Sequence, residues 1–219
     1  MSAAYSAIVR SLENLPEQAT LRIAFFAQAG ARIVAVSDSH GGASCQGGLD
    51  LAGVAAHKER TGSVVGAAGT SEVSNEQVLS LECDVLIPAA LENQIHRGNA
   101  AAVRATLVVE AANSPTTPAA DRVLYERGIP VLPDVLANSG GVCVSYFEWV
   151  QNIENEQWDE EDVNAKLRVK MERASDAVLD RQAQLNRDHP DRPVDLRTAA
   201  FVVGVGRVAD VALERGIWP

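Results

Sequence analysis

The 219-residue sequence lacks several features that would point to particular classes of protein. No apolar run approaches the roughly 20 residues that a bilayer-spanning helix needs, so we expect no membrane association. Basic charge is scarce. With 19 Lys and Arg against 29 Asp and Glu, the formal net charge is −10, which repels the phosphates of nucleic acids and of anionic lipids. Nucleic acids and membranes are therefore not among the expected partners.

Cysteine is also scarce, and its three copies, Cys45, Cys83 and Cys143, are far apart in the sequence. An odd, dispersed set predicts reduced thiols in a cytoplasmic protein rather than a disulfide framework. The four histidines have no ligand-type spacing relative to these cysteines, so we expect no metal site. The first 18 residues include charged side chains before any long apolar run, which argues against a signal peptide.

What the sequence does contain is a series of short apolar runs rich in Val and Ile. These are Arg32–Ser37, Cys83–Pro88, Thr106–Glu110 and Ile129–Pro133. Runs this short are more typical of buried strands than of helices. Helix-like stretches lie between them, at Glu92–Ala105 and Pro118–Arg127, and Gly128 follows the second as a helix stop. The alternation predicts an α/β fold with a mostly parallel sheet.

The last part of the sequence is helical in pattern. Asp159–Asp162 places acidic residues at a helix N-terminus, where the helix dipole favours them, and apolar residues then follow at helical spacing. Asp195 can cap a final helix that continues to Gly216. We therefore expect a C-terminal helical tail after the sheet.

The residues that follow each apolar run are the candidate binding residues, because ligands of a parallel open sheet bind at the carboxyl ends of its strands. Asp38 follows the first run. Its carboxylate would either accept hydrogen bonds from the adenosine ribose of a dinucleotide or cap its own loop, and position alone does not decide between the two. Asn113 and Asn138 follow later runs among small residues and offer both a donor and an acceptor, which suits a carboxamide.

Five segments, most of them at predicted strand ends, occur in a characteristic order: Val36–Ser39, Ile87–Ile95, Glu110–Pro118, Asp134–Val142 and Val144–Trp149. Together they closely resemble the C-terminal, nucleotide-binding domain of the glutamate dehydrogenases, within the glutamate/leucine/phenylalanine/valine dehydrogenase family. The resemblance runs from about Phe25 to Trp218. It implies a Rossmann-like sheet and an NAD(P)-dependent oxidoreductase.

The resemblance implies cofactor contacts for five positions. Asp38 would contact the adenosine ribose, and Ala89 and Ala90 would line the wall beside the nicotinamide ribose. Asn113 would hold the nicotinamide carboxamide, with Asn138 close to the ring and the substrate. The charge of Asp38 disfavours a 2′-phosphate, so NAD is expected more than NADP. The neighbouring hydroxyls and imidazole of Ser37, Ser39 and His40 would instead accommodate a phosphate.

Ser145 is the position that the resemblance links to the substrate. In glutamate-type members a serine here contacts the side-chain carboxylate of glutamate, where branched-chain enzymes place an apolar residue. The alternative is that Ser145 is a buried small residue hydrogen-bonded to its own helix.

Two departures from the family pattern limit what is expected of the chain. The three lysines, Lys58, Lys166 and Lys170, match none of the lysines of the family's N-terminal substrate domain, so no catalytic residue is assigned. The glycine-rich turn of the nucleotide domain is also missing. Tyr5–Asn14 resembles the helix before that turn, and Leu15–Ala24 contains no glycine. We therefore expect the first central strand to be missing and dinucleotide binding to be weak.

Three functions follow as candidates. The first is NAD(P)-dependent oxidative deamination of L-glutamate to 2-oxoglutarate and ammonia, without turnover by the isolated chain. The second is a non-catalytic, truncated relative acting as a regulatory or interaction subunit, and the third is a plain nucleotide-binding module. A homo-oligomer and a partner chain both stay open. The expected organisation is a truncated N-terminal helix and junction (1–24), a Rossmann-like nucleotide-binding domain (25–150) and a C-terminal helical segment that packs back on it (151–219).

Overall fold

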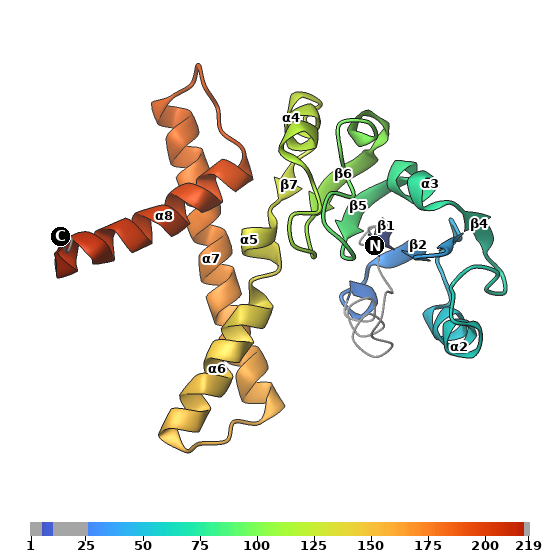
Figure 1. Cartoon of the computed structure of the whole chain (residues 1–219), viewed down its shortest axis with the longest axis horizontal. Helices are drawn as coiled ribbons and strands as arrows, with labels where there is room; N and C mark the ends of the chain where they lie inside the picture. The colour runs from blue at the N-terminus through green and yellow to red at the C-terminus, as the bar shows by residue number, and fades with distance from the viewer. Residues whose placement is uncertain (1–5, 11–25, 217–219) are drawn as a thin grey trace. The chain divides into compact units, whose positions relative to one another are not determined.

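The computed structural model describes residues 6–10 and 26–216 (Figure 1). The chain divides into two compact units, Met1–Val131 and Leu132–Pro219. The first unit contains a sheet with its helices, and the second is made of helices. The division falls between the two boundaries that the sequence suggested, after residues 24 and 150.

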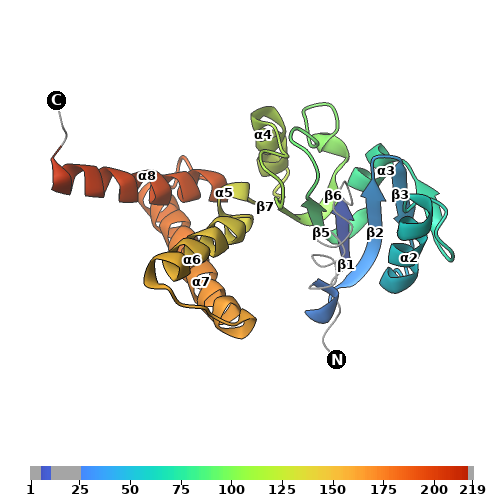
Figure 2. The same ribbon diagram turned by 60° about the horizontal axis from the view of Figure 1, so that its bottom comes forward.

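A seven-stranded, mostly parallel sheet forms the first unit, in the order β4-β3-β2-β1-β5-β6-β7 (Figure 2). β1 pairs in parallel with β2 and β5, and β5 pairs in parallel with β6, whereas β3 and β4 are antiparallel at one edge. The predicted α/β fold with a mostly parallel sheet is confirmed. The strands are β1 (Ser6–Arg10), β2 (Arg32–Asp38), β3 (Gly41–Ser44), β4 (Ser71–Val73), β5 (Glu82–Pro88), β6 (Arg104–Val109) and β7 (Val131–Leu132).

The central strand that we expected to be missing is present. Ser6–Arg10, predicted as part of a helix over Tyr5–Asn14, forms β1 between β2 and β5. Val9, for example, is in register with Val36 on one side and Ile87 on the other. Without this strand, two facing rows of main-chain N–H and C=O groups in the middle of the sheet would lack partners, which outweighs a weak local preference for helix.

The sequence after β1 departs from the dinucleotide-binding pattern, in which a phosphate-binding turn stands at this point. That turn normally carries the glycines that allow the pyrophosphate to approach the main chain. Here the first glycine of the chain is Gly30, so Ser11–Ala29 has none. Residues 26–28 are helical. Residues 11–25, on which the predicted loss within Leu15–Ala24 falls, lie outside the described residues.

Both faces of the sheet are covered by helices. Leu86 of β5 belongs to a core cluster with Leu79 and Leu124, whereas its neighbour Ile87 belongs to a second cluster with Val54. Since successive strand residues point to opposite faces, these clusters fill the two sides of the sheet. The helices that supply them are α2 (Leu51–Thr61) on one side, and α3 (Asn75–Ser80) and α4 (Pro118–Glu126) on the other.

The predicted helix over Pro118–Arg127 is confirmed as α4, but the one over Glu92–Ala105 is wrong. That segment holds only the 3-10 turn η1 (Ala100–Ala102) before β6 begins. The Arg127 guanidinium donates to the carbonyls of Ala100 and Val103, each at 2.7 Å. These tertiary hydrogen bonds use carbonyls that a helix would need for itself, so the segment adopts an irregular path.

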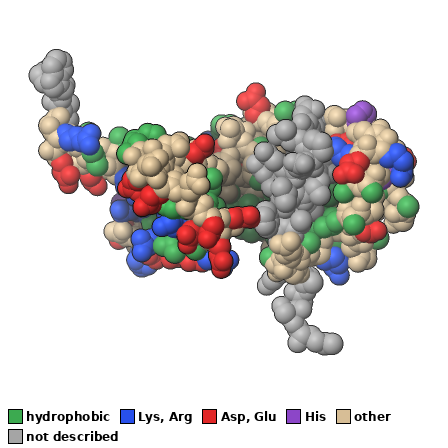
Figure 3. Space-filling view, turned by 90° about the horizontal axis from the view of Figure 1, so that it is seen from below, with side chains coloured by type: hydrophobic (Ala, Val, Ile, Leu, Met, Phe, Trp, Pro, Cys, Tyr) green, Lys and Arg blue, Asp and Glu red, His purple; other side chains and the backbone are tan. Residues whose placement is uncertain are grey.

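The second unit confirms the predicted helical tail. The predicted cap is present, since the Asp195 side chain accepts from the N–H of Thr198 at 2.7 Å, and the acidic start at Asp159–Asp162 is a helix N-terminus that Asp159 caps by accepting from the N–H of Asp162 at 2.9 Å. Figure 3 shows acidic and basic side chains interspersed over the surface of this unit. Its helices are α5 (Asp134–Ala137), α6 (Gly140–Glu154), α7 (Glu160–Asp188) and α8 (Leu196–Arg215).

The core of the helical unit is small. It consists of Leu136 from α5, Val178 from α7, and Ala199 and Ala200 from the first turn of α8. Most of α8 beyond these alanines carries exposed apolar side chains, with Val208 the most exposed of its valines at 71%. Along α8, burial is therefore confined to the part that lies against α5 and α7, while Phe147 of α6 is buried elsewhere in this unit.

Candidate functional site

Four strands of the first unit end at the same edge of the sheet, because β2, β1, β5 and β6 are parallel. The structure places four of the predicted site residues at the ends of these strands. Asp38 is the last residue of β2, Ala89 and Ala90 follow β5, and Asn113 lies in the loop after β6. This carboxyl edge is the candidate site of the first unit.

Asp38 begins a tight turn between β2 and β3. It pairs with Gly41 across a two-residue loop made of Ser39 and His40. The Asp38 side chain accepts a hydrogen bond from the N–H of His40, two residues on, at 2.9 Å. This is the Asx-turn arrangement that makes Asp a frequent turn residue, and it is the loop-capping role that the sequence left open.

The same carboxylate accepts from residues far along the chain. Its Oδ2 accepts from the N–H of Val64 at 2.8 Å and from the ammonium of Lys58 at 3.3 Å, and its Oδ1 accepts from the hydroxyl of Ser63 at 3.3 Å. The Asp38 side chain is only 1% exposed, whereas that of Lys58 is 20% exposed. Asp38 is therefore a buried acid with an ion-pair partner that reaches solvent.

The electrostatic balance keeps this acid ionised. Burial by itself raises the pKa of Asp38, but the N–H groups of His40 and Val64 and the charge of Lys58 outweigh it, so the pKa lies below the ordinary value of 3.8. Hydrogen bonds to the charged form and a nearby cation both favour the carboxylate. Asp38 and Lys58 thus form a neutral ion pair at the end of β2.

The loops after β5 and β6 are joined through their main chains. The N–H groups of Ala111 and Ala112 both donate to the carbonyl of Pro88 at 3.1 Å. Further on, the N–H of Ile95 donates to the carbonyl of Pro115 at 2.9 Å, and the Ile95 carbonyl accepts from Thr117 at 2.9 Å. The pairing holds the two loops side by side just beyond the ends of their strands.

The two loops bring the predicted nicotinamide residues to one part of the edge. Ala89 and Ala90 are half-buried at the start of one loop, and Asn113 is exposed in the other. Small side chains leave room for a flat ring to approach the main chain, and an amide offers a donor and an acceptor. The arrangement is able to line a wall and to hydrogen-bond a planar polar group.

Three buried side-chain atoms in the described part of the chain have no hydrogen-bond partner: Ser37 Oγ, Asn75 Oδ1 and Thr116 Oγ1. All three lie near the carboxyl edge. Ser37 precedes Asp38, Asn75 donates through Nδ2 to the Asp38 carbonyl at 3.0 Å, and Thr116 bridges to Ile95. Unpaired buried polar atoms are costly and uncommon, so their presence here supports the choice of this edge as the candidate site.

Sequence reasoning missed the roles of Lys58, Ser63, Val64 and Asn75. Lys58 was considered only as a match to the family's substrate-domain lysines. Nothing in the local pattern around these residues shows that they reach Asp38, which is 20 to 37 residues away. Thr116, by contrast, lies inside one of the five segments that carried the family resemblance.

The remaining predicted residues belong to the second unit. Asn138 is the half-buried C-cap of α5, and its N–H donates to the carbonyl of Asp134 at 3.0 Å. Ser145 lies on α6 and is exposed, which differs from the alternative of a buried, helix-bonded serine. Its hydroxyl is therefore available on the surface of this unit.

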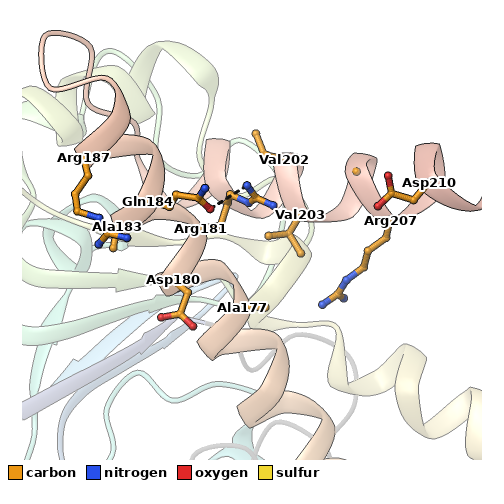
Figure 4. Close-up of a pocket in the computed structure, with 11 residues that line it drawn as sticks. Ala177, Asp180, Arg181, Ala183, Gln184, Arg187, Val202, Val203, Arg207 and Asp210 are labelled. Atoms are coloured by element: carbon orange, nitrogen blue, oxygen red, sulfur yellow. Dashed lines mark hydrogen bonds between the residues drawn. The ribbon is translucent and has the colours of Figure 1, made fainter.

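The helical unit also contains an open pocket of about 450 Å³ between α7 and α8 (Figure 4). Arg181 at its rim donates to the side-chain oxygen of Gln184 at 3.1 Å, and Arg187 and Arg207 also line it. Asp180 and Asp210 line it as well, and none of the residues predicted for cofactor or substrate does. The pocket is separate from the candidate site in composition and in position along the chain.

Within residues 6–10 and 26–216, the structure shows neither a metal-ion cluster nor a membrane-spanning helix. No group of three or more His, Cys, Asp and Glu side chains in this part of the chain is arranged to hold a metal ion. None of the helices in the described ranges is both long and apolar enough for a membrane span.

A mostly parallel sheet with helices on both faces, and with small and amide residues at its carboxyl edge, defines the class of Rossmann-type domains. Within that class, a family profile described as Glutamate/Leucine/Phenylalanine/Valine dehydrogenase matches residues 17–216. The chain belongs to this family.

Curated relatives include enzymes named for either cofactor. The chain is 44% identical over 192 residues to the NAD-specific glutamate dehydrogenase of Staphylococcus aureus (strain COL), an overlap of 88% of this chain and 44% of the relative. It is 51% identical over 195 residues to NADP-specific glutamate dehydrogenase A1 of Halobacterium salinarum, which covers 88% of this chain and 45% of the relative. The chain thus spans less than half the length of these relatives.

A solved structure also matches the chain over nearly its whole length. The hetero-hexameric glutamate dehydrogenase from Thermus thermophilus, in its Leu-bound form, superposes with a TM-score of 0.86 and 31% identity. The match covers 99% of this chain and 49% of that chain.

Proposed function

We propose that this chain is the dinucleotide-binding part of a glutamate dehydrogenase. The reaction converts L-glutamate, NAD(P)⁺ and water into 2-oxoglutarate, ammonium, NAD(P)H and a proton. The observation that carries the proposal is the paired loops at the carboxyl edge, which set Ala89 and Ala90 beside the loop of Asn113 in a chain of this family.

The bound dinucleotide supplies the nicotinamide ring that accepts the hydride. Ala89 and Ala90 line the wall beside the nicotinamide ribose, because their methyl groups leave the main chain open to close approach. Asn113 holds the carboxamide, since its exposed amide both donates and accepts. A ring held by these residues would be oriented by the protein, which is the contribution that these residues would make to hydride transfer.

The second unit supplies the substrate contacts in this proposal. Asn138 lies near the ring and the amino acid, and Ser145 donates its hydroxyl to the side-chain carboxylate of glutamate. The exposure of Ser145 on α6 supports the second role. An apolar residue at this position would leave a buried carboxylate without that donor, so a serine favours glutamate over branched-chain substrates.

The base that deprotonates the substrate is not assigned to this chain. The relatives are about twice as long, and the groups that hold and deprotonate the amino acid belong to their remaining half in this proposal. We therefore expect the 219-residue chain alone to show no glutamate-dependent reduction of NAD⁺ or NADP⁺. A second candidate, a non-catalytic regulatory or interaction subunit, is favoured by the absence of glycine from Ser11–Ala29.

Dinucleotide binding is best tested by saturation-transfer NMR, which detects millimolar affinities. With the purified chain, the nicotinamide protons of NAD⁺ should receive saturation. Asn113→Ala should reduce that transfer severalfold, while Asn152→Ala, an exposed amide on α6, should leave it unchanged. Absence of transfer to any NAD⁺ proton, or equal transfer in both variants, would refute the assignment of Asn113. Turnover by the isolated chain would refute the expectation of inactivity.

A further inference from the structure

We propose that Asp38 is a structural clamp at the adenosine end of the site, that its carboxylate does not bind the ribose, and that NAD and NADP are therefore accepted alike. The clamp stands on the contacts of Asp38 alone. The statement about the two cofactors rests in addition on the proposed function.

The carboxylate of Asp38 has no acceptor capacity left for a ligand. Oδ1 accepts from the N–H of His40 and the hydroxyl of Ser63. Oδ2 accepts from the N–H of Val64 and the ammonium of Lys58. An ionised carboxylate offers about four lone-pair positions, and these donors fill them. Ribose hydroxyls would have to displace a donor that the protein already supplies.

Displacement is unfavourable because the carboxylate is enclosed. The Asp38 side chain is 1% exposed, so a ribose on the surface of the edge does not reach it. Breaking the 2.8 Å hydrogen bond from Val64 would leave the N–H of a fully buried residue unpaired. A hydrogen bond from the ribose would at best replace the one from Val64. Leaving the buried Val64 amide unpaired costs more free energy than an ordinary hydrogen bond contributes.

The contacts of Asp38 connect segments that are distant in sequence. Lys58 lies on α2, 20 residues away, and Val64 lies in the loop after α2, 26 residues away. The Asp38 carbonyl accepts from the side chain of Asn75 at the start of α3, 37 residues away. One residue thus fixes both helices and the intervening loop to the end of β2, which is what a clamp requires.

The charge at the end of β2 affects whether the site distinguishes NAD from NADP. In a dinucleotide fold an acid here favours NAD, because its charge repels the 2′-phosphate of NADP. Asp38 is instead neutralised by Lys58 at 3.3 Å. The side chain that the same turn exposes is His40, at 67%. A buried, neutralised acid beside an exposed imidazole offers no repulsion, and similar relatives are named for both cofactors.

The clamp is tested by amide hydrogen exchange and thermal unfolding of Asp38→Asn, which need no ligand. We expect exchange at Val64 to become at least tenfold faster and the midpoint of unfolding to fall by about 5 to 10 °C. The control is Asp50→Asn, whose exposed side chain makes one capping bond to Gly53 that asparagine retains. Unchanged exchange and midpoint in Asp38→Asn would overturn the clamp. If this variant does not fold, Lys58→Met removes the ion pair with Asp38 but leaves the hydrogen bond from Val64, and it should show the same changes at smaller size.

Cofactor acceptance is tested by titrating the wild-type chain with adenosine 5′-monophosphate and with adenosine 2′,5′-bisphosphate. Neither fragment contains the pyrophosphate group that the glycine-rich turn of a dinucleotide fold binds. We expect dissociation constants within about threefold of each other. Binding of the monophosphate more than tenfold tighter would overturn equal acceptance. Binding of neither would overturn the proposed function and equal acceptance together, while the exchange of Val64 would still decide the clamp.

Discussion

Asn93 and Ser114 lie opposite one another in the two loops of the carboxyl edge, and the N–H of Asn93 donates to the carbonyl of Ser114 at 2.9 Å. Both have a left-handed backbone, with φ of 56° and 46°. Such a conformation is uncommon for residues other than glycine, although asparagine adopts it more readily than most. Backbone strain of this kind concentrates at functional sites, and here it adjoins the proposed nicotinamide wall at Ala90 and the loop of Asn113.

The left-handed backbone of Asn93 predicts different stabilities for two small substitutions. Asn93→Gly should leave the free energy of unfolding nearly unchanged, because glycine adopts a positive φ without cost. Asn93→Ala should lower it by about 1 kcal/mol, because alanine has a β-carbon and no polar side chain to support this conformation. Urea unfolding of the two variants beside the wild type measures the difference. Equal stabilities for Gly and Ala at this position would show that residue 93 is not left-handed in solution.

Asp38 should govern part of the acid sensitivity of the fold. Its pKa is lowered in the folded state, so its contribution to stability is present above the unfolded value of 3.8 and is lost as the pH falls through the folded value. Compared with Asp38→Asn, the wild type should be more stable by about 1 to 3 kcal/mol at pH 7. That advantage should decline as the pH falls below the unfolded value and vanish once the pH is below the lowered folded value. Chemical unfolding of both proteins across this range measures it, and a constant difference would contradict the role of the charge.

Cys83 should be the least reactive of the three cysteines. Burial, with a smaller contribution from the charge of Asp84, raises the pKa of the Cys83 thiol to about 12. Thiolates are the form that alkylating reagents attack, so almost none is present at pH 8. Cys45 and Cys143 are only half-buried. Native alkylation followed by peptide mass spectrometry should modify these two and spare Cys83 until denaturant is added. Early modification of Cys83 would mean that β5 opens readily.

The sheet was predictable from the sequence where one segment contains all the information that it needs. Arg32–Ser37 and Thr106–Glu110 became strands because short runs of β-branched residues suit a surface that is buried on both sides. The helix starts at Asp159 and Asp195 were predictable for the same reason, since the residues that stabilise each start lie within it or directly before it.

Prediction failed where a distant segment decides the structure. Ser6–Arg10 is a strand because β2 and β5 leave a place between them, and the pattern of its own residues does not show this. The candidate site divides in the same way. The position of Asp38 at the end of β2 was predictable, but its partners Lys58, on α2, and Val64, in the loop after α2, become apparent only in the folded chain.

Two valines of the helical unit should respond very differently to truncation. Val178 is 4% exposed in the cluster formed by α5, α7 and α8, whereas Val208 is 71% exposed on α8. Val178→Ala removes two buried methyl groups and leaves a cavity, which should cost about 2 kcal/mol. Val208→Ala should change stability by less than about 0.5 kcal/mol, and the better helix propensity of alanine favours a small gain.

Denaturation followed by the circular dichroism of the helices compares these two variants directly, with the wild type measured at several protein concentrations. If Val208→Ala proves as destabilising as Val178→Ala, and the loss depends on concentration, then Val208 is covered in solution by another molecule. A loss that is independent of concentration would instead mean that α8 folds back on its own chain. Because the two substitutions remove the same atoms, the difference between them measures burial alone.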